Sequence, residues 1–383
     1  MALFCEGSDQ QPLPRCLRLI ESADQPVAKR CSLGQNAGMK SIMAQLAAGK
    51  NLKMGQVAES AAFLVDAAAP SAAKADFLRA LADKGETPDE IAAFVKEFLK
   101  RAVDPGIDSA RMPGPVLDVV GTGGDQLNLF NVSTTAMFIL AAGGVCIVKH
   151  GNRGITGKSG GADVLEALGI KIDLPKEKVA EGVRTIGLGF LFAPLYHPAF
   201  KAVVEARKLL AAEGRRSIFN ILGPLLNPAR PDHQLIGVFD PALTKTFGAI
   251  LKKLGRKAAW IVHGSAGEGR GMDELSTLGE SHITQLSGTR LTTTTVDPVA
   301  LGFPKPQLAD LVGGDAAENA DILEGILSGA TKGPRRDLAV LNAAAGFVIT
   351  GKAPDLAQGC DLALNLLKRG APHVKMREMQ ALC

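Results

Sequence analysis

The sequence predicts an α/β protein in two unequal parts: a small all-helical N-terminal domain, and a large domain with a mostly parallel sheet covered by helices. A chain of 383 residues is too long for one small module and short for three ordinary domains. Residues 39–104 show only helical periodicity, whereas residues 110–383 alternate short apolar runs with helical patterns. That alternation is typical of parallel strands joined by helices.

Composition places the chain among globular proteins and excludes several other classes. Apolar residues make up 46% and charged residues 21%, which excludes a wholly disordered, collagen-like or coiled-coil chain. The net charge of +4 includes no block of like charge, and one Tyr and one Trp leave few rings for base stacking, so nucleic acid is not an expected partner. The longest apolar stretch, Met137 to Val148, is too short to cross a membrane.

Residues 1–38 have no sustained period, and we expect them to form a disordered extension. They lack the basic and apolar regions of a secretion signal, and the six cysteines of the chain show no zinc or disulfide spacing. We therefore expect reduced thiols and a cytoplasmic location.

The helical domain, residues 39–104, has its clearest signal at Gly85–Ile91. Thr87 is placed to cap a helix, Pro88 to occupy its first position, and Glu90 to complete a capping box. A single apolar stripe follows, formed by Ile91, Phe94, Val95, Phe98 and Leu99. The stripe needs a partner, so we expect it to dock on the rest of the chain or on a second subunit, and a helical segment near 198–220 to join the same domain.

The large domain, residues 110–383, is predicted from short buried runs and helical patterns in alternation. Strands are predicted at Val116–Val120, Val145–Val148, Leu235–Phe239 and Trp260–His263, and helices near 132–143, 161–169, 177–186, 241–254, 318–328, 335–350 and 355–369. Ligands of such sheets bind at the carboxyl ends of the strands.

A glycine-rich turn follows the first predicted strand, in the segment Asp118–Thr134. Backbone amides and the positive end of the helix that begins after Asn131 converge there, which favours an anion. The pattern is neither a Walker loop nor a dinucleotide fingerprint. Alone, it fits a tight turn with a helix cap about as well as a phosphate site.

A second loop of this kind, Val148–Asp163, contains two lysines, one arginine and five glycines between a strand and a helix. A solvated basic loop is the alternative interpretation. Two such loops at one edge of a sheet indicate a polyphosphate ligand. The adjacent acids Asp273 and Glu274, soon after another strand, have the oxygen ligands that Mg²⁺ prefers, although such pairs are more often solvated.

Several segments together resemble the anthranilate phosphoribosyltransferase family, in its order and close to its spacing, from about residue 39 to the end. They are GTGGD, NVST, KHGNR, KSGGADVLEALG, HPAF, IFNILGPLLNPA, the Asp273–Glu274 pair and GPRRDLAVLNAAA. The resemblance implies a nucleoside phosphorylase/phosphoribosyltransferase-like fold. It also implies that phosphoribosyl pyrophosphate and anthranilate are the substrates, giving N-(5-phosphoribosyl)anthranilate and pyrophosphate in tryptophan biosynthesis, with Mg²⁺ as cofactor and a homodimer formed through the helical domain.

The resemblance also assigns residues to each ligand. The positions implied for phosphoribosyl pyrophosphate are Gly121, Gly124, Asp125, Asn131, Ser133, Thr134 and Lys149, and the basic loop adds Arg153 and Lys158. Those implied for Mg²⁺ are Ser133, Asp273 and Glu274, and those for anthranilate are Gly121, His150, Asn152 and Arg207. A guanidinium suits the planar carboxylate of the acceptor. We assign no general base, because His150 fits a gating or packing ring at least as well as a proton acceptor.

The sequence departs from the family at several positions. Gln126 replaces a glycine, Leu129 a threonine, and Gly157 and Gly161 two serines. The stretch after Arg207 is about three residues longer than expected, so Arg215 or Arg216 is an alternative carboxylate ligand, and Ser265–Arg270 lengthens the approach to Asp273. Two alternatives therefore stay open: a transferase or phosphorylase of the same fold with another aromatic or heterocyclic acceptor, and a non-enzymatic relative that binds nucleic acid.

Overall fold

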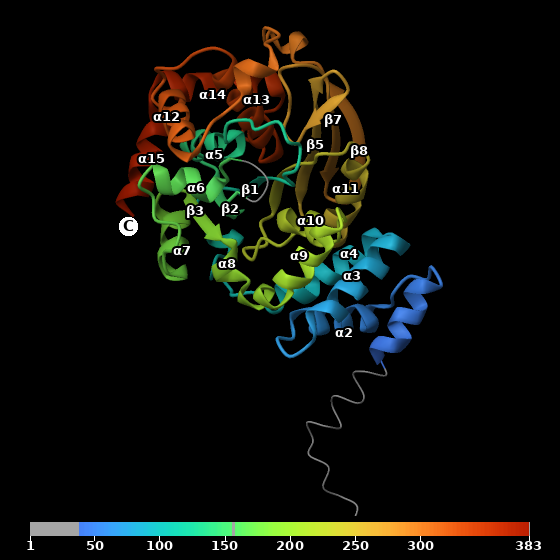
Figure 1. Cartoon of the computed structure of the whole chain (residues 1–383). Coiled ribbons are helices and arrows are strands. Elements are labelled where there is room, and N and C mark those ends of the chain that lie inside the picture. Colours follow the sequence, from blue (N-terminus) through green and yellow to red (C-terminus); the bar gives the residue numbers. More distant parts are fainter. Residues whose placement is uncertain (1–37, 155–157, 383) are drawn as a thin grey trace, which may run out of the picture.

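The computed structural model describes residues 38–154 and 158–382, so residues 1–37 of the expected extension and Gly157 lie outside the described residues. A unit of helices lies at one end of the molecule, beside a larger body of sheet and helices (Figure 1). The sheet is mostly parallel, which confirms the predicted fold class.

The helical unit consists of a helix over residues 38–47 followed by α2 (Met54–Val65), α3 (Ser71–Lys84) and α4 (Pro88–Leu99). A later helix, α9 (Val204–Ala212), packs on α3. The apolar stripe of α4 is buried against α11 (Leu243–Lys253) and shares a core with Phe247 and Leu251. The stripe therefore docks on the rest of the chain, and a second subunit is not needed to cover it.

The start of α4 carries the predicted capping box and a buried ion pair. Thr87 Oγ1 accepts from the Glu90 amide at 3.3 Å, and Glu90 Oε2 accepts from the Thr87 amide at 2.9 Å. Lys84 Nζ lies 2.6 Å from Glu90 Oε2, and the two side chains are only 2% and 1% exposed. Burial alone would raise the pKa of Glu90, but hydrogen bonds from Leu52, Lys84 and Thr87 make the net shift downward.

Replacing Glu90 by Ala is expected to lower the free energy of unfolding by about 3–5 kcal/mol, because Lys84 is left charged and buried without its partner. Since the folded pKa of Glu90 lies below the unfolded one, its stabilisation is complete above about pH 4.3 and is lost as the pH falls through the folded value. Urea unfolding at pH 7 and in acid measures both effects. Glu97→Ala is the control, because its partner Lys100 is 66% exposed and the loss should stay below about 1 kcal/mol. Equal losses in the two variants would contradict the role of the buried pair.

The sheet of the large domain has the order β3-β2-β1-β4-β5-β7-β8, and β6 pairs with β5. The strands in chain order are β1 (Val116–Gly121), β2 (Cys146–Gly151), β3 (Leu188–Phe192), β4 (His233–Gly237), β5 (Ala258–Gly267), β6 (Arg270–Met272), β7 (Ser281–Ser287) and β8 (Arg290–Val296). The run from β3 to β5 is parallel, and β6, β7 and β8 join antiparallel. The carboxyl ends of the parallel strands therefore share one edge.

Helices cover both faces of this sheet, because successive residues of each buried strand point to opposite sides. Leu117 and Val119 pack under α5 and α13, whereas Val116 packs with α7 on the other face. The first face is covered by α5 (Val132–Ala142), α6 (Gly161–Ala167), α12 (Ala316–Leu327), α13 (Pro334–Ile349), α14 (Leu356–Lys368) and α15 (Ala371–Ala381). The second carries α7 (Lys176–Thr185) and α11.

Short elements complete the connections. They are α8 (Ala193–Tyr196), α10 (Phe219–Leu222) and single 3-10 turns at Ser109–Arg111, Pro198–Val203, Gly223–Leu225, Val299–Leu301 and Leu308–Leu311. Among the helices of the described residues, none has both the length and the apolar character needed to cross a membrane.

Candidate active site

The two glycine-rich loops meet at the carboxyl edge of the sheet and enclose a cleft of about 360 Å³. The first loop follows β1 and leads into α5, and the second follows β2 and leads into α6. Every described residue that the sequence assigned to phosphoribosyl pyrophosphate or Mg²⁺ lines this one cleft: Gly121, Gly124, Asp125, Asn131, Ser133, Thr134, Lys149, Arg153, Lys158, Asp273 and Glu274. The N-terminus of α5 and the basic loop thus face a common space, in which an anion is favoured.

Lys149 lies at the base of the cleft, on β2. Its Nζ donates to Val119 O at 2.5 Å and to Ser133 Oγ at 3.0 Å, and the residue is 4% exposed. Burial lowers the pKa of Lys149, while the carboxylates of Asp118, Glu274 and Asp273 oppose that shift. Arg153 is placed differently: it pairs with Glu166 at 2.8 Å and stacks on Phe192, so α6 and β3 hold it at the rim.

Asp273 is held in place by backbone on two sides. Its Oδ2 accepts from the Gly123 amide at 2.6 Å. A Cβ on Gly237 would collide with Asp273 O, and one on Gly121 would collide with Asp273 Oδ2. Only glycine fits at positions 121 and 237 while Asp273 keeps this position.

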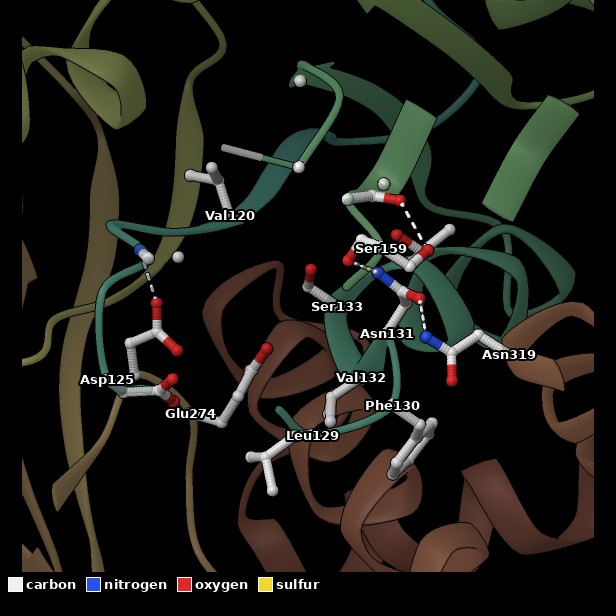
Figure 2. Close-up of a pocket in the computed structure, with 18 of the residues that line it drawn as sticks. Val120, Asp125, Leu129, Phe130, Asn131, Val132, Ser133, Ser159, Glu274 and Asn319 are labelled. Carbon is white, nitrogen blue, oxygen red and sulfur yellow. Dashed lines mark hydrogen bonds between the residues drawn. The ribbon is translucent and has the colours of Figure 1, made fainter. Parts of the chain in front are cut away.

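The acidic pair, Asp273 and Glu274, is half-buried at the wall of the cleft. Burial, followed by the charge of Asp125, raises the pKa of Asp273 to about 7. Burial, followed by the charge of Asp273, raises the pKa of Glu274 well above its usual range. Figure 2 shows Glu274 extending toward Ser133. The charge of Lys149 opposes the shift of Glu274 without outweighing it. A further cation would stabilise the charged carboxylates, so the donor set fits a divalent metal ion.

The described part of the chain has no group of three or more His, Cys, Asp or Glu side chains arranged around a metal position. A cation at Asp273 and Glu274 would therefore need further oxygen ligands, such as the Ser133 hydroxyl and the phosphates of a substrate. Mg²⁺ commonly binds in this way, through one or two carboxylates and substrate oxygens.

A second cavity, of about 540 Å³, adjoins the cleft and shares Gly121–Gly124, Gln126 and His150–Asn152 with it. Its far side is lined by Phe200, Arg207, Arg216, Phe219 and Phe239. The sequence assigned Gly121, His150, Asn152 and Arg207 to the acceptor, and all four line this cavity. An aromatic molecule fits such walls, because they combine rings with guanidinium groups.

His150 is buried between the two spaces. Its ring meets the His197 ring edge-on with centroids 5.2 Å apart, and Nε2 has no hydrogen-bond partner among the described residues. Burial, with a further contribution from His197, lowers the pKa of His150 to about 3. His197 is itself fixed, because its Nε2 lies 2.8 Å from Leu226 O. The imidazole of His150 is therefore neutral at physiological pH.

The three candidate arginines point to different surroundings. Arg207 lies over the Phe219 ring at 5.5 Å, and burial lowers the pKa of its guanidinium. Arg216 lies over the Phe239 ring at 4.1 Å and also lines the cavity. Arg215 instead pairs with Asp83 of α3 at 2.8 Å and is absent from the cavity wall. The longer loop after Arg207 thus leaves two arginines at the cavity, and Arg207 is the more buried of them.

The departures from the family pattern have distinct surroundings. Gln126 is exposed and has φ of 59°, a left-handed conformation that a glycine adopts more easily. Leu129 packs on the hydrophobic core and bridges to Val312. A Cβ on Gly161 would lie 3.2 Å from Thr134 Oγ1, so a side chain here would press on the start of α5.

Two residues near the cleft were not singled out from the sequence. Asp118 is buried on β1, and its Oδ2 has no hydrogen-bond partner in the part of the chain that the structure describes. Burial raises the pKa of Asp118 to about 6. Asn319, on α12, lines the cleft and bonds to Asn131. The one available signal was the segment GDAAENADIL, residues 314–323, which contains Asn319 and also resembles the family.

Comparisons with known proteins agree with this geometry. Residues 113–373 match the glycosyl transferase family, a/b domain, and residues 40–102 match the glycosyl transferase family, helical bundle domain. An anthranilate phosphoribosyltransferase of Moorella thermoacetica is 42% identical over 344 residues, covering 90% of this chain and 98% of that protein.

Solved structures are similar throughout. Anthranilate phosphoribosyltransferase from Thermus thermophilus superposes with a TM-score of 0.81 at 36% identity, covering 89% of this chain and 98% of the other. The Saccharomyces cerevisiae enzyme in complex with PRPP and Mg has a TM-score of 0.79 at 25% identity, covering 90% of this chain and 98% of its own. The same yeast protein has also been solved with 4-fluoroanthranilate.

Proposed function

The chain belongs to the glycosyl transferase family and, within it, to the anthranilate phosphoribosyltransferases, and from that membership we propose how its two adjoining cavities perform the reaction. The protein transfers the phosphoribosyl group of phosphoribosyl pyrophosphate to anthranilate, giving N-(5-phosphoribosyl)anthranilate and pyrophosphate in tryptophan biosynthesis. The observation that carries the proposed mechanism is the shared wall: Gly121–Gly124 and His150–Asn152 border both spaces. A donor in the cleft and an acceptor in the second cavity would meet there.

We assign the cleft to phosphoribosyl pyrophosphate. The amides of the glycine loops, the N-terminus of α5 and Lys149 supply positive potential, which suits a ligand with several phosphate groups. Asp273 and Glu274, with Ser133, would hold Mg²⁺, which would neutralise charge on the departing pyrophosphate. Glycine at 121, 123 and 124 lets the backbone approach the ligand closely.

We assign the second cavity to anthranilate. Arg207 would bind its carboxylate while Phe219 and Phe200 contact the ring. In the reaction the amine nitrogen forms a bond to the anomeric carbon as the bond to pyrophosphate breaks, and the proton that the nitrogen loses passes to the departing pyrophosphate or to water. A histidine with a pKa of about 3 is a poor proton acceptor, so His150 would position the substrates and keep water out. Catalysis then depends mainly on positioning and on stabilising the leaving group.

A fluorescence assay tests this proposal. The emission of anthranilate should fall only when phosphoribosyl pyrophosphate and Mg²⁺ are both supplied. Aniline, which lacks the carboxylate, should release pyrophosphate at least about tenfold more slowly. Loss of emission without the donor, or no loss at high donor concentration, would contradict the assignment. If pyrophosphate is released only with a different aromatic or heterocyclic acceptor, the protein is a transferase of the same fold that acts on that acceptor.

We also propose a homodimer formed through the helical unit. Met54, at the start of α2, is 75% exposed, so its apolar side chain is available to a second copy of the helical unit. Light scattering after gel filtration should give twice the mass of the 39.9 kDa chain, and a monomeric mass would contradict the proposal.

A further inference from the structure

Asn319 lies outside both glycine loops, yet its side chain is joined to the donor cleft. It is part of α12, more than 180 residues along the chain from the start of α5, and is 2% exposed. Its carboxamide is not needed to cap α12. Asp315 performs that task, because its Oδ1 accepts from the amides of Ala317 and Glu318 at 2.9 Å each.

Three hydrogen bonds in series connect Gly314, Asn319, Asn131 and Ser159, and Figure 2 shows the last two of them. The Gly314 amide donates to Asn319 Oδ1 at 2.9 Å, and Asn319 Nδ2 donates to Asn131 Oδ1 at 3.0 Å. Asn131 Nδ2 then donates to Ser159 O at 3.2 Å. Each carboxamide thus accepts with its oxygen and donates with its nitrogen. Turning either amide over would place donors against donors, so the chain of bonds fixes both side chains.

The backbone around this chain of bonds is packed too closely for a different arrangement. A Cβ on Gly313 would collide with Asn319 Oδ1 and would lie 2.7 Å from the Cα of Phe130. The Gly313 amide also donates to Asn128 O at 2.8 Å. The segment before α12 is therefore in direct contact with the first glycine loop, and Asn319 is linked to the second loop through Asn131.

We propose that Asn319 is a positioning residue for the phosphoribosyl donor. It acts through Asn131, and it holds the first turn of α5 and the second glycine loop at the separation that the donor requires. Asn319 is the buried member of this network, and its Nδ2 also donates to Gly314 O at 3.3 Å. Breaking its bonds is costly, because the freed amide groups of Asn319 stay out of reach of water. The proposal rests on the proposed function for the identity of the ligand, but not for the geometry of the network.

The kinetic test uses Asn319→Ala in the full chain with phosphoribosyl pyrophosphate, Mg²⁺ and anthranilate. We expect the KM for phosphoribosyl pyrophosphate to rise about tenfold, and the KM for anthranilate to change less than twofold. In an Asn131→Ala background, Asn319→Ala should add less than a factor of two, because the link is already lost. Equal effects on both substrates, or effects that multiply in the double variant, would overturn the proposal.

Asp315→Ala is the matched control. It removes the cap of α12 and loosens the same helix end, but it leaves the bonds of Asn319 in place. The KM for phosphoribosyl pyrophosphate should stay within twofold of wild type, and a tenfold rise would mean that Asn319 contributes only to helix stability. Should Asn319→Ala fail to fold, Asn319→Asp keeps the oxygen that accepts from Gly314 and loses the donor to Asn131, with the same expected rise.

A measurement without ligands separates this proposal from the assignment of the reaction. Amide hydrogen exchange at residues 158–163 should accelerate at least threefold in Asn319→Ala and stay unchanged in Asp315→Ala. Unchanged exchange in both variants would overturn the positioning role. If exchange accelerates in Asn319→Ala but the wild-type protein does not consume anthranilate, the positioning role of the network is supported and only the proposed function is contradicted.

Discussion

Asp273→Asn combined with Glu274→Gln is expected to lower kcat/KM by at least about a thousandfold while the protein remains folded. Both side chains are half-buried at the cleft, and burial raises the pKa of each, so Lys149 balances their charge only in part. The amide replacements preserve shape and remove the negative oxygens that would hold Mg²⁺. Steady-state rates across a Mg²⁺ titration measure the effect, and the loss should not be recovered at high metal concentration.

A matched pair of remote substitutions controls for charge. Asp361→Asn with Glu378→Gln also removes one aspartate and one glutamate charge, but on α14 and α15, away from the cleft. This variant should keep kcat/KM within twofold of wild type. Thermal unfolding of the Asp273/Glu274 variant should occur at the wild-type temperature or above, because two buried charges are gone. If the Asp273/Glu274 variant keeps the wild-type rate, these acids do not bind the metal ion. If the variant unfolds at a lower temperature, the two acids contribute to the stability of the fold.

The donor side of the site was predictable because its residues are adjacent in sequence. Each glycine loop lies between a strand and a helix, so one segment reveals both the turn and the helix start that bind an anion. The placement of Asp273 was not predictable in the same way. It depends on the close approach of Gly121 and Gly237, which come from two different strands, and no short segment contains all three.

The predicted helices match the structure to within about two residues at most ends, but four strands were missed. Leu188–Phe192 is a short buried run that begins soon after α7 ends, and Gly189, its second residue, weakens the strand pattern. Arg290–Val296 is almost entirely exposed, so its threonine-rich sequence lacks apolar alternation. Both β7 and β8 belong to an antiparallel extension, which the expectation of a parallel sheet did not include.

The two longer loops have different consequences. Ser265–Arg270 forms the turn between β5 and β6, where Gly267, Glu268 and Gly269 all have positive φ. That insertion lengthens a hairpin and leaves Asp273 in the cleft. The stretch after Arg207 extends α9 to Ala212 and turns Arg215 outward to Asp83, so the length of the loop alone could not identify the carboxylate ligand.

Arg207→Ala is expected to raise the KM for anthranilate by about thirtyfold or more and to leave the KM for phosphoribosyl pyrophosphate within twofold. Arg207 is half-buried beside Phe219, and burial lowers the pKa of its guanidinium, which shows how little solvent compensates the charge. A bound carboxylate would supply that compensation. Arg207→Lys keeps the charge but loses the two-pronged geometry, so its effect should be intermediate.

Arg216 and Arg215 supply the comparison within the same loop. Arg216→Ala should raise the KM for anthranilate less than Arg207→Ala does, because the Arg216 side chain is stacked on Phe239 at the exposed side of the cavity. Arg215→Ala removes only a surface pair with Asp83 and should change neither KM by more than twofold. If Arg216→Ala has the larger effect, the carboxylate is bound at Arg216 and Arg207 only supports Phe219. If Arg207→Ala changes the KM of both substrates equally, the acceptor does not bind in this cavity. An arginine that binds only the carboxylate of the acceptor would leave the KM for the donor unchanged.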